Sequence, residues 1–330
     1  MNSETMICCD EYLFGKISHN LSYEDLVLAN GLANSIRSFS YCGTEVQFPC
    51  GRWNIDFLNI LNDMHIEYRV RKVSDLLDCS CFNHFIVLVP KEFLTNFKKL
   101  NLEVVQIGIV YSAFQIVERE GKNFQLRLSW NGNTENITMS IEQLKILETL
   151  KTRPLGNTLK IIEVQENEYG GSKKIVFEKM VENLKKCLVT CASEYEGCHC
   201  VSGPLFYDLF VQSIHSMSEM DSKSISSRVC RHLFVSSLNA GGEAFFRSAF
   251  FNWYVKYRMP FGNIPKSYLE KIEWLIKLWH ELCRKMRFWK AGNYAKEKVP
   301  ELVDLIQQIK PLELEIVQFI VDMEEEKYDL

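Results

Sequence analysis

The sequence predicts an α+β protein in two parts, and three observations lead to that fold class. Helical patterns come first, strand-like segments then cluster between residues 68 and 164, and the pattern from residue 168 onward is helical. Helices beside a group of neighbouring strands are typical of an α+β domain with a mainly antiparallel sheet. We therefore expect such a domain at 1–167 and an all-α domain at 168–330, in a chain of 330 residues that is long enough for both.

Two helices are predicted near the start of the chain. Apolar residues at helical spacing indicate the first over 6–20. Ser22 is a candidate N-cap for the second, because acidic residues follow it in the first turn and Gly31 offers a natural end. An amphipathic helix is predicted over 54–64, and Ser74 is expected to cap a short helix through Leu77.

The strands are predicted from alternating or wholly apolar segments bounded by turn residues. Phe85–Val89 is the most apolar of them and reads as a strand buried on both faces. Ser140 is expected to cap a helix over 141–149. The predicted strands are 36–41, 68–71, 85–89, 104–111, 113–118, 124–130 and 159–164.

A linker rich in glycine and serine, Glu168–Ser172, is expected to separate the two parts. Everything after it reads as helix, including a segment with buried apolar positions at 269, 272, 275, 276 and 279. The predicted helices are 175–195, 204–217, 221–239, 242–258, 265–291, 299–310 and 312–327.

Composition narrows the class of protein. Hydrophobic residues make up 47% of the chain and the formal net charge is -4, which gives no overall attraction to nucleic acid or to anionic membranes. The first residues lack the basic and apolar regions of a signal peptide, and no apolar run has the length of a membrane span. We expect a cytoplasmic protein whose twelve cysteines are reduced thiols.

Common cofactor and metal motifs are absent from the sequence. It contains no GxxxxGK[ST], GxGxxG, GxSxG or HExxH pattern, so no cofactor is expected. Cys187, Cys191, Cys198 and Cys200 invite a zinc interpretation, but only the first pair has ligand spacing and burial explains it equally well. Cys79 and Cys81 are also too close together, and we expect no metal.

The adjacent thiols of Cys8 and Cys9 are the candidate nucleophiles. They open the first predicted helix, where unpaired backbone N–H groups and the helix dipole favour a thiolate. The alternative is that both are small buried apolar residues. Cysteine catalysis also needs a histidine and a group that orients it.

Several segments together resemble the BtrH-like family. The segments are Cys9 with the helix behind it, 29–36 with Asn30 and Gly31, the strands 85–90 and 105–111, and, further on, 238–254 with its Gly241-Gly242 and Phe246-Arg247 pairs. The family is named for an acyltransferase of butirosin biosynthesis. The resemblance implies a papain-like cysteine-peptidase fold for the N-terminal domain and a helical domain after it.

Carried over residue by residue, the resemblance makes Cys9 the nucleophile, with Cys8 as second choice, and places Asn30 and Gly31 along the site. It sets Gln106 at the position of the family's strand histidine and Asn131 at that of its acidic group. Glutamine cannot act as a general base, so these triad positions are degenerate. His84 precedes a different strand and is interpreted as a structural residue.

The resemblance implies acyl or aminoacyl transfer from a carrier-protein thioester to an amine, in the biosynthesis of a natural product. The expected partners are an acyl carrier protein and a small amine acceptor, with homo-oligomers possible. A catalytically inactive scaffold or binding protein on the same fold is the alternative, because the expected histidine is missing. An amide hydrolase is a third hypothesis that needs the same histidine.

Overall fold

The computed structural model describes 23–32, 35–41, 44–50, 61–62, 65–90, 111–130, 133–151, 158–165, 173–195, 198–220, 231, 243–260, 262 and 264–326. By spatial contact the chain divides into two compact units, each built from two stretches of sequence. The first unit comprises Met1–Leu26 and Asn54–Val176. The second comprises Val27–Trp53 and Phe177–Leu330.

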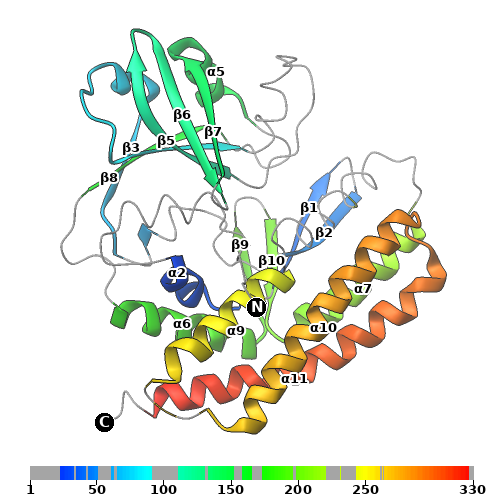
Figure 1. Ribbon diagram of the computed structural model, residues 1–330. Coiled ribbons are helices and arrows are strands. Elements are labelled where there is room, and N and C mark those ends of the chain that lie inside the picture. The colour runs from blue at the N-terminus through cyan, green and yellow to red at the C-terminus, as the bar shows by residue number, and fades with distance from the viewer. Residues whose placement is uncertain are drawn as a thin grey trace. The chain divides into compact units, whose positions relative to one another are not determined.

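The first unit contains a six-stranded antiparallel sheet with the order β3-β8-β4-β5-β6-β7 (Figure 1). Its apolar strand β4 (Phe85–Pro90) lies between β8 (Lys160–Val164) and β5 (Tyr111–Glu120) and is buried along its whole length. The outer members are β3 (Tyr68–Arg71), β6 (Asn123–Trp130) and β7 (Asn133–Ser140). The strands predicted at 68–71, 85–89, 113–118, 124–130 and 159–164 are confirmed, whereas β7 was not predicted.

Both faces of this sheet are buried at β4. On one face Val87 and Phe114 pack with α5 (Ile141–Thr149) and the 3-10 turn η1 (Val73–Leu77). Ser140 caps α5, since its hydroxyl accepts from the Gln143 N–H at 3.2 Å and the Gln143 side chain accepts from the Ser140 N–H at 2.8 Å. On the other face Ile86, Leu88 and Ile162 are 1%, 0% and 0% exposed.

The second unit has a four-stranded antiparallel sheet that joins distant parts of the chain. Its order is β2-β1-β10-β9. The pair β1 (Ser35–Tyr41) and β2 (Thr44–Cys50) comes from the first fifth of the sequence, and β9 (Cys191–Tyr195) with β10 (Cys198–Ser202) comes from beyond its middle. Ser35 of β1 stands opposite Ser202 of β10, which sets the register.

Helices complete the second unit. The helix α7 (Leu205–Glu219) packs beside β1, β2 and β10, and the long helices α10 (Lys266–Ala291) and α11 (Val299–Glu325) lie alongside each other (Figure 1). The helix α9 (Glu243–Arg258) contacts α10, and the short turn η2 (Lys296–Lys298) leads into α11. Two further helices, α2 (Tyr23–Asn30) and α6 (Lys173–Leu188), begin in the first unit and end in the second.

Two predictions of the sequence analysis are wrong at the level of single elements. Residues 191–195 were expected to prolong a helix but form β9, and β10 follows it, so the C-terminal region is not helical throughout. The predicted break near Pro311 is also absent, because α11 continues through that proline. The predicted elements at 6–20, 104–110 and most of 54–64 and 221–239 lie outside the described residues.

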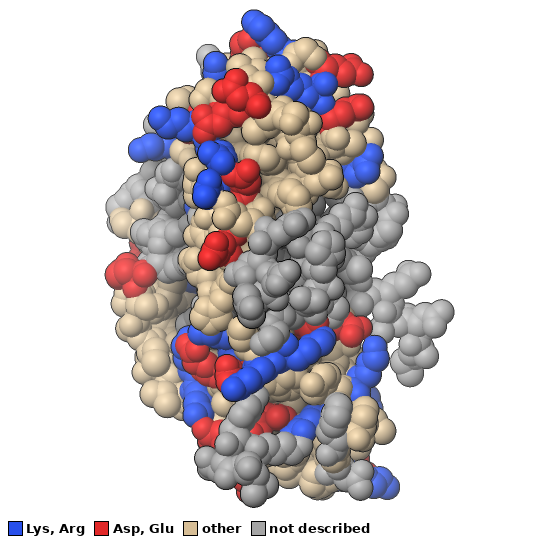
Figure 2. Space-filling model, turned by 90° about the vertical axis from the view of Figure 1, so that its left-hand side faces the viewer, with Lys and Arg blue, Asp and Glu red and all other residues tan. Residues whose placement is uncertain are grey.

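Charges of both signs are interspersed over the face that Figure 2 displays. Lysines and arginines alternate there with aspartates and glutamates among the coloured residues, and no broad area of one sign is visible. None of the described helices combines the length and the apolar character that crossing a bilayer requires.

Gly203, just before α7, provides a test of the fold. Its φ is +80°, and a Cβ placed there would lie 2.3 Å from the Val189 carbonyl oxygen. Gly121 has a φ of +59° but open space around it. We expect Gly121→Ala to cost about 1 kcal/mol through the left-handed backbone alone, and Gly203→Ala to cost several times more. Urea denaturation of both variants measures the difference, and equal losses would contradict the close contact.

Candidate active site

Most of the residues predicted to carry chemistry lie outside the described part of the chain. This applies to Cys8, Cys9, Gln106 and Asn131, whose predicted roles stay predictions. Asn30 is the last residue of α2, and Gly31 follows it with a φ of +61°. Gly31 thus ends the helix as expected, with its N–H donating to the Leu28 carbonyl at 3.0 Å.

His84 is the described residue with the strongest claim to a catalytic role in the first unit. It directly precedes β4, and its carbonyl accepts a hydrogen bond from the Val164 N–H at 2.9 Å. Its side chain is half-buried. Its backbone is therefore held beside a fully buried strand, while its side chain keeps access to solvent.

The alternation of a strand indicates which face His84 shares. Side chains two residues apart point to the same side, so His84 is expected on the face of Ile86 and Leu88. Gln115 stands directly opposite Ile86 on that face and is half-buried. Gln115 is therefore expected diagonally across from His84 on the neighbouring strand. Diagonal neighbours of this kind are within the distance at which long side chains interact.

The sequence contains a pattern that makes His84 a candidate catalytic residue. His84-Phe85-Ile86-Val87-Leu88-Val89 is similar to the His-x-Val-Val-Val-x-Gly strand that is typical of the BtrH-like family, although Pro90 stands where that pattern has glycine. The resemblance instead set Gln106, on the strand expected at 104–111, at the position of the family's histidine. His84 becomes a second candidate because it directly precedes β4, which lies inside the sheet.

The buried and half-buried thiols of the described residues are poor nucleophiles. Burial raises the pKa of Cys79, whose Sγ donates to the Asp75 carbonyl at 3.3 Å. Cys187, Cys200 and Cys283 are buried, and the Cys187 thiol donates to the Leu32 carbonyl. Among the residues that the structure describes, no group of three His, Cys, Asp or Glu side chains could hold a metal ion.

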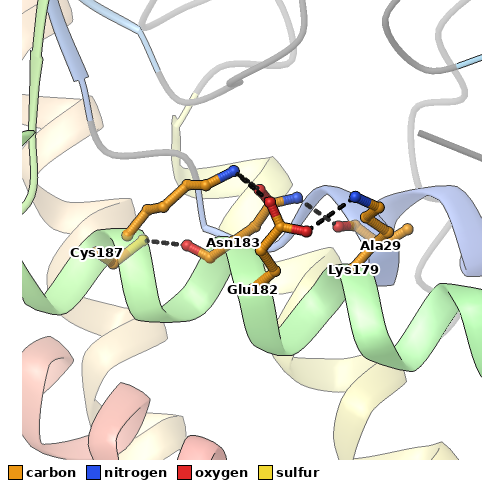
Figure 3. Close-up of polar contacts among 6 residues, drawn as sticks. Ala29, Lys179, Glu182, Asn183 and Cys187 are labelled. Atoms are coloured by element: carbon orange, nitrogen blue, oxygen red, sulfur yellow. Dashed lines mark hydrogen bonds and ion pairs between the residues drawn. The ribbon is translucent and has the colours of Figure 1, made fainter. Parts of the chain in front are cut away.

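Ala29, which directly precedes Asn30 and Gly31, belongs to a contact between α2 and α6 in the second unit (Figure 3). Asn183 on α6 is buried, and its Nδ2 donates to the Ala29 carbonyl oxygen at 2.9 Å. A Cβ at Gly31 would lie 3.1 Å from the Asn183 Cβ, so glycine permits both the turn and the close approach. The segment predicted to line the site is thus anchored by α6.

A line of charged side chains runs along α6 beside this contact (Figure 3). Glu182 accepts from Lys179 at 2.8 Å and from Lys186 at 2.9 Å. These two hydrogen bonds lower the pKa of Glu182. The pairs are spaced three and four residues apart along α6, where exposed ion pairs contribute little to stability.

The second-domain motif of the resemblance has a structural explanation. Arg247 from that motif lies on α9 with 1% of its side chain exposed, and its Nε donates to Glu313 Oε2 on α11 at 3.0 Å. Tyr207 Oη and Trp279 Nε1 donate to the same carboxylate at 2.7 and 2.5 Å. The guanidinium also stacks 3.9 Å from the centre of the Trp279 ring.

A second buried pair repeats this arrangement about three helical turns further along both helices. Arg258 of α9 lies 2.6 Å from Glu324 of α11, and Tyr254 donates to the same carboxylate at 2.8 Å. Burial, together with the neighbouring carboxylate, raises the pKa of Tyr254 and likewise that of Tyr207. Arg247 and Tyr254 therefore stabilise the helical region and do not form part of a described site.

Comparison with known proteins gives no relative to set beside this chain. No protein-family model matches it, and no curated protein matches it significantly.

The anchoring contact on α6 can be tested by removing its amide. We expect Asn183→Ala to lower the free energy of unfolding by about 1–3 kcal/mol, because the buried Ala29 carbonyl would lose its donor. Lys179→Ala on the same helix is the matched control and should change little. Thermal denaturation followed by circular dichroism measures both. A control loss as large as that of Asn183→Ala would argue against the anchor.

The buried carboxylate of Glu313 gives a larger expected effect. Arg247→Ala leaves that charge without its cation and should cost about 3–5 kcal/mol. Lys310→Ala, which removes an exposed pair with Asp208 between α11 and α7, should leave the unfolding midpoint nearly unchanged. Denaturant unfolding compares the two variants. Similar midpoints would show that the buried pair contributes no more to stability than the exposed pair.

Proposed function

We propose that the protein is a cysteine-dependent acyl or aminoacyl transferase in natural-product biosynthesis, with Cys9 or Cys8 as nucleophile and His84 as general base. The donor is an acyl group on a carrier-protein thioester, and the acceptor is a small amine. The single observation that carries this proposal is the position of His84 at the start of the buried central strand β4.

His84 is the candidate for the histidine that the sequence lacks at Gln106, and its position directly before β4 supports the proposal. Gln115, on the face expected for His84, is the candidate to orient the imidazole. A neutral amide can fix a ring by hydrogen bonding, as asparagine does in papain-like proteases.

The proposed reaction has two balanced steps. In the first, the cysteine thiolate attacks the carbonyl carbon of the carrier thioester, and the carrier leaves as a thiol that takes its proton from the imidazolium of His84. In the second, the amine attacks the acyl-enzyme thioester, His84 accepts the amine proton, and the cysteine leaves as a thiolate. Backbone N–H groups at the start of the cysteine's helix would stabilise the oxyanion.

Two alternatives use the same fold. With an amide in place of the thioester donor and water in place of the amine, the same residues would make an amide hydrolase. A scaffold or binding protein would need no reactive thiol at all. The experiment below separates the scaffold from both enzymes, and product analysis with and without an added amine then separates transfer from hydrolysis.

Iodoacetamide labelling followed by peptide mapping tests the nucleophile. We expect Cys9 or Cys8 to be alkylated faster than the other thiols, with the rate persisting at pH 6 because the imidazolium stabilises the thiolate. Cys79 is the internal control, since burial raises its pKa. Slow or uniform labelling at Cys8 and Cys9 would favour the scaffold.

The histidine is tested by a pair of variants under the same conditions. His84→Gln should slow alkylation of the reactive cysteine at pH 6 about tenfold or more, because the thiol pKa returns towards about 8.5. Gln106→Ala should leave the rate unchanged. An unchanged rate in His84→Gln would remove His84 from the mechanism, and a slower rate in Gln106→Ala would give the strand predicted at 104–111 a part in the site.

A further inference from the structure

The outward face of α10 carries a stripe with the spacing of a helix-pairing seam. We define the α10 stripe by its members, which recur at alternating intervals of four and three residues: Glu270, Trp274, Lys277, Glu281, Arg284 and Phe288. The buried residues of α10, such as Leu275, Leu282 and Met286, occupy the opposite side. The α10 stripe therefore faces away from the core of its own unit.

Two large apolar side chains are exposed in this stripe. Trp274 is 53% exposed and Phe288 is 66% exposed, which places both among the most exposed large apolar residues of the described part of the chain. They lie about 21 Å apart along the helix axis. Tryptophan and phenylalanine exposed on one helix face are typical anchors of protein–protein contacts.

The charges of the α10 stripe are complementary to themselves. Lys277 and Glu281 lie two residues before and after position 279, and Trp274 and Arg284 lie five residues before and after it. A two-fold axis at that position, with the helices antiparallel, would set Lys277 against Glu281 of the second copy. It would also set Trp274 against that copy's Arg284, and symmetry makes each contact twice.

The local geometry favours this arrangement. Arg284 is held by Glu281 through hydrogen bonds of 2.8 and 2.6 Å, and its guanidinium lies 5.8 Å from the centre of the Phe288 ring. These hydrogen bonds lower the pKa of Glu281 to about 2, so it stays charged at neutral pH. A guanidinium held in place can receive the face of an indole ring.

We propose that the α10 stripe is the surface through which two copies of this chain associate as a two-fold symmetric dimer with antiparallel α10 helices. The occupant is a second copy because the complementary partners of the stripe are members of the same stripe. A contact along one helix is small, so the dimer is weak, with a dissociation constant of roughly micromolar order. The proposal is independent of the proposed catalytic function.

Sedimentation velocity of the full chain across a concentration series tests the association. We expect reversible dimer formation that weakens at high salt, where the Lys277–Glu281 contacts are screened. Trp274→Ala should weaken it at least tenfold. Ile146→Ala is the matched control, because it removes an exposed apolar side chain from the other unit and should have no effect.

Charge reversal gives the decisive experiment. Lys277→Glu places glutamates against glutamates, and Glu281→Lys places lysines against lysines, so each variant alone should be monomeric. An equimolar mixture should form a heterodimer, because each reversed residue then meets its opposite charge. Circular dichroism checks that both variants are folded. If Glu281→Lys does not fold, the separate variants Lys277→Glu and Trp274→Ala carry the test.

Three results would overturn the proposal. The first is a wild-type chain that remains monomeric up to hundreds of micromolar. The second is a dimer that survives both charge reversals, since its interface would then lie elsewhere. The third is a mixture of the two folded variants that stays monomeric although the wild type dimerises.

Discussion

The helical part of the second unit depends on one buried carboxylate. Glu313 of α11 receives donors from Tyr207 of α7, Arg247 of α9 and Trp279 of α10, so a single side chain joins four helices. A charge buried this deeply is tolerated only when its partners are all in place. The arrangement therefore specifies which helix faces meet, whereas apolar packing alone would permit small rotations and slips. The ion pair of Arg258 and Glu324 joins α9 and α11 a second time.

Much of the secondary structure could be predicted from the sequence, because the signals were local. The Ser140 cap, the end of α2 at Gly31 and the apolar strand β4 are each set by neighbouring residues. What failed depends in part on distant pairing. Cys191–Tyr195 pairs with its neighbour in the sequence, Cys198–Ser202, which is a local signal that the helix prediction missed. The pairing of β10 with β1, which lies some 160 residues earlier in the chain, is the part that no pattern within a short window contains.

The candidate site shows the same division between local and distant information. The reactive-thiol hypothesis rests on a helix start, which is a local signal, and it stays a prediction for Cys8 and Cys9. The role proposed for His84 rests on the place of β4 between β8 and β5. The Arg247 motif illustrates the opposite case, since a pattern that suggested a functional domain is explained by buried ion pairing. A recurring motif can therefore reflect the requirements of packing as well as those of chemistry.

The pairing of β1 with β10 also sets the order of events as the chain is made. Residues 35–50 leave the ribosome early, but the strand that covers the edge of β1 follows only with residues 198–202. At about 5–20 residues per second this leaves an open strand edge for roughly ten to thirty seconds. Unpaired edges attract other chains, so the nascent protein should depend on chaperones during this interval. A fragment that begins after the linker would lack β1 altogether and leave β10 uncovered.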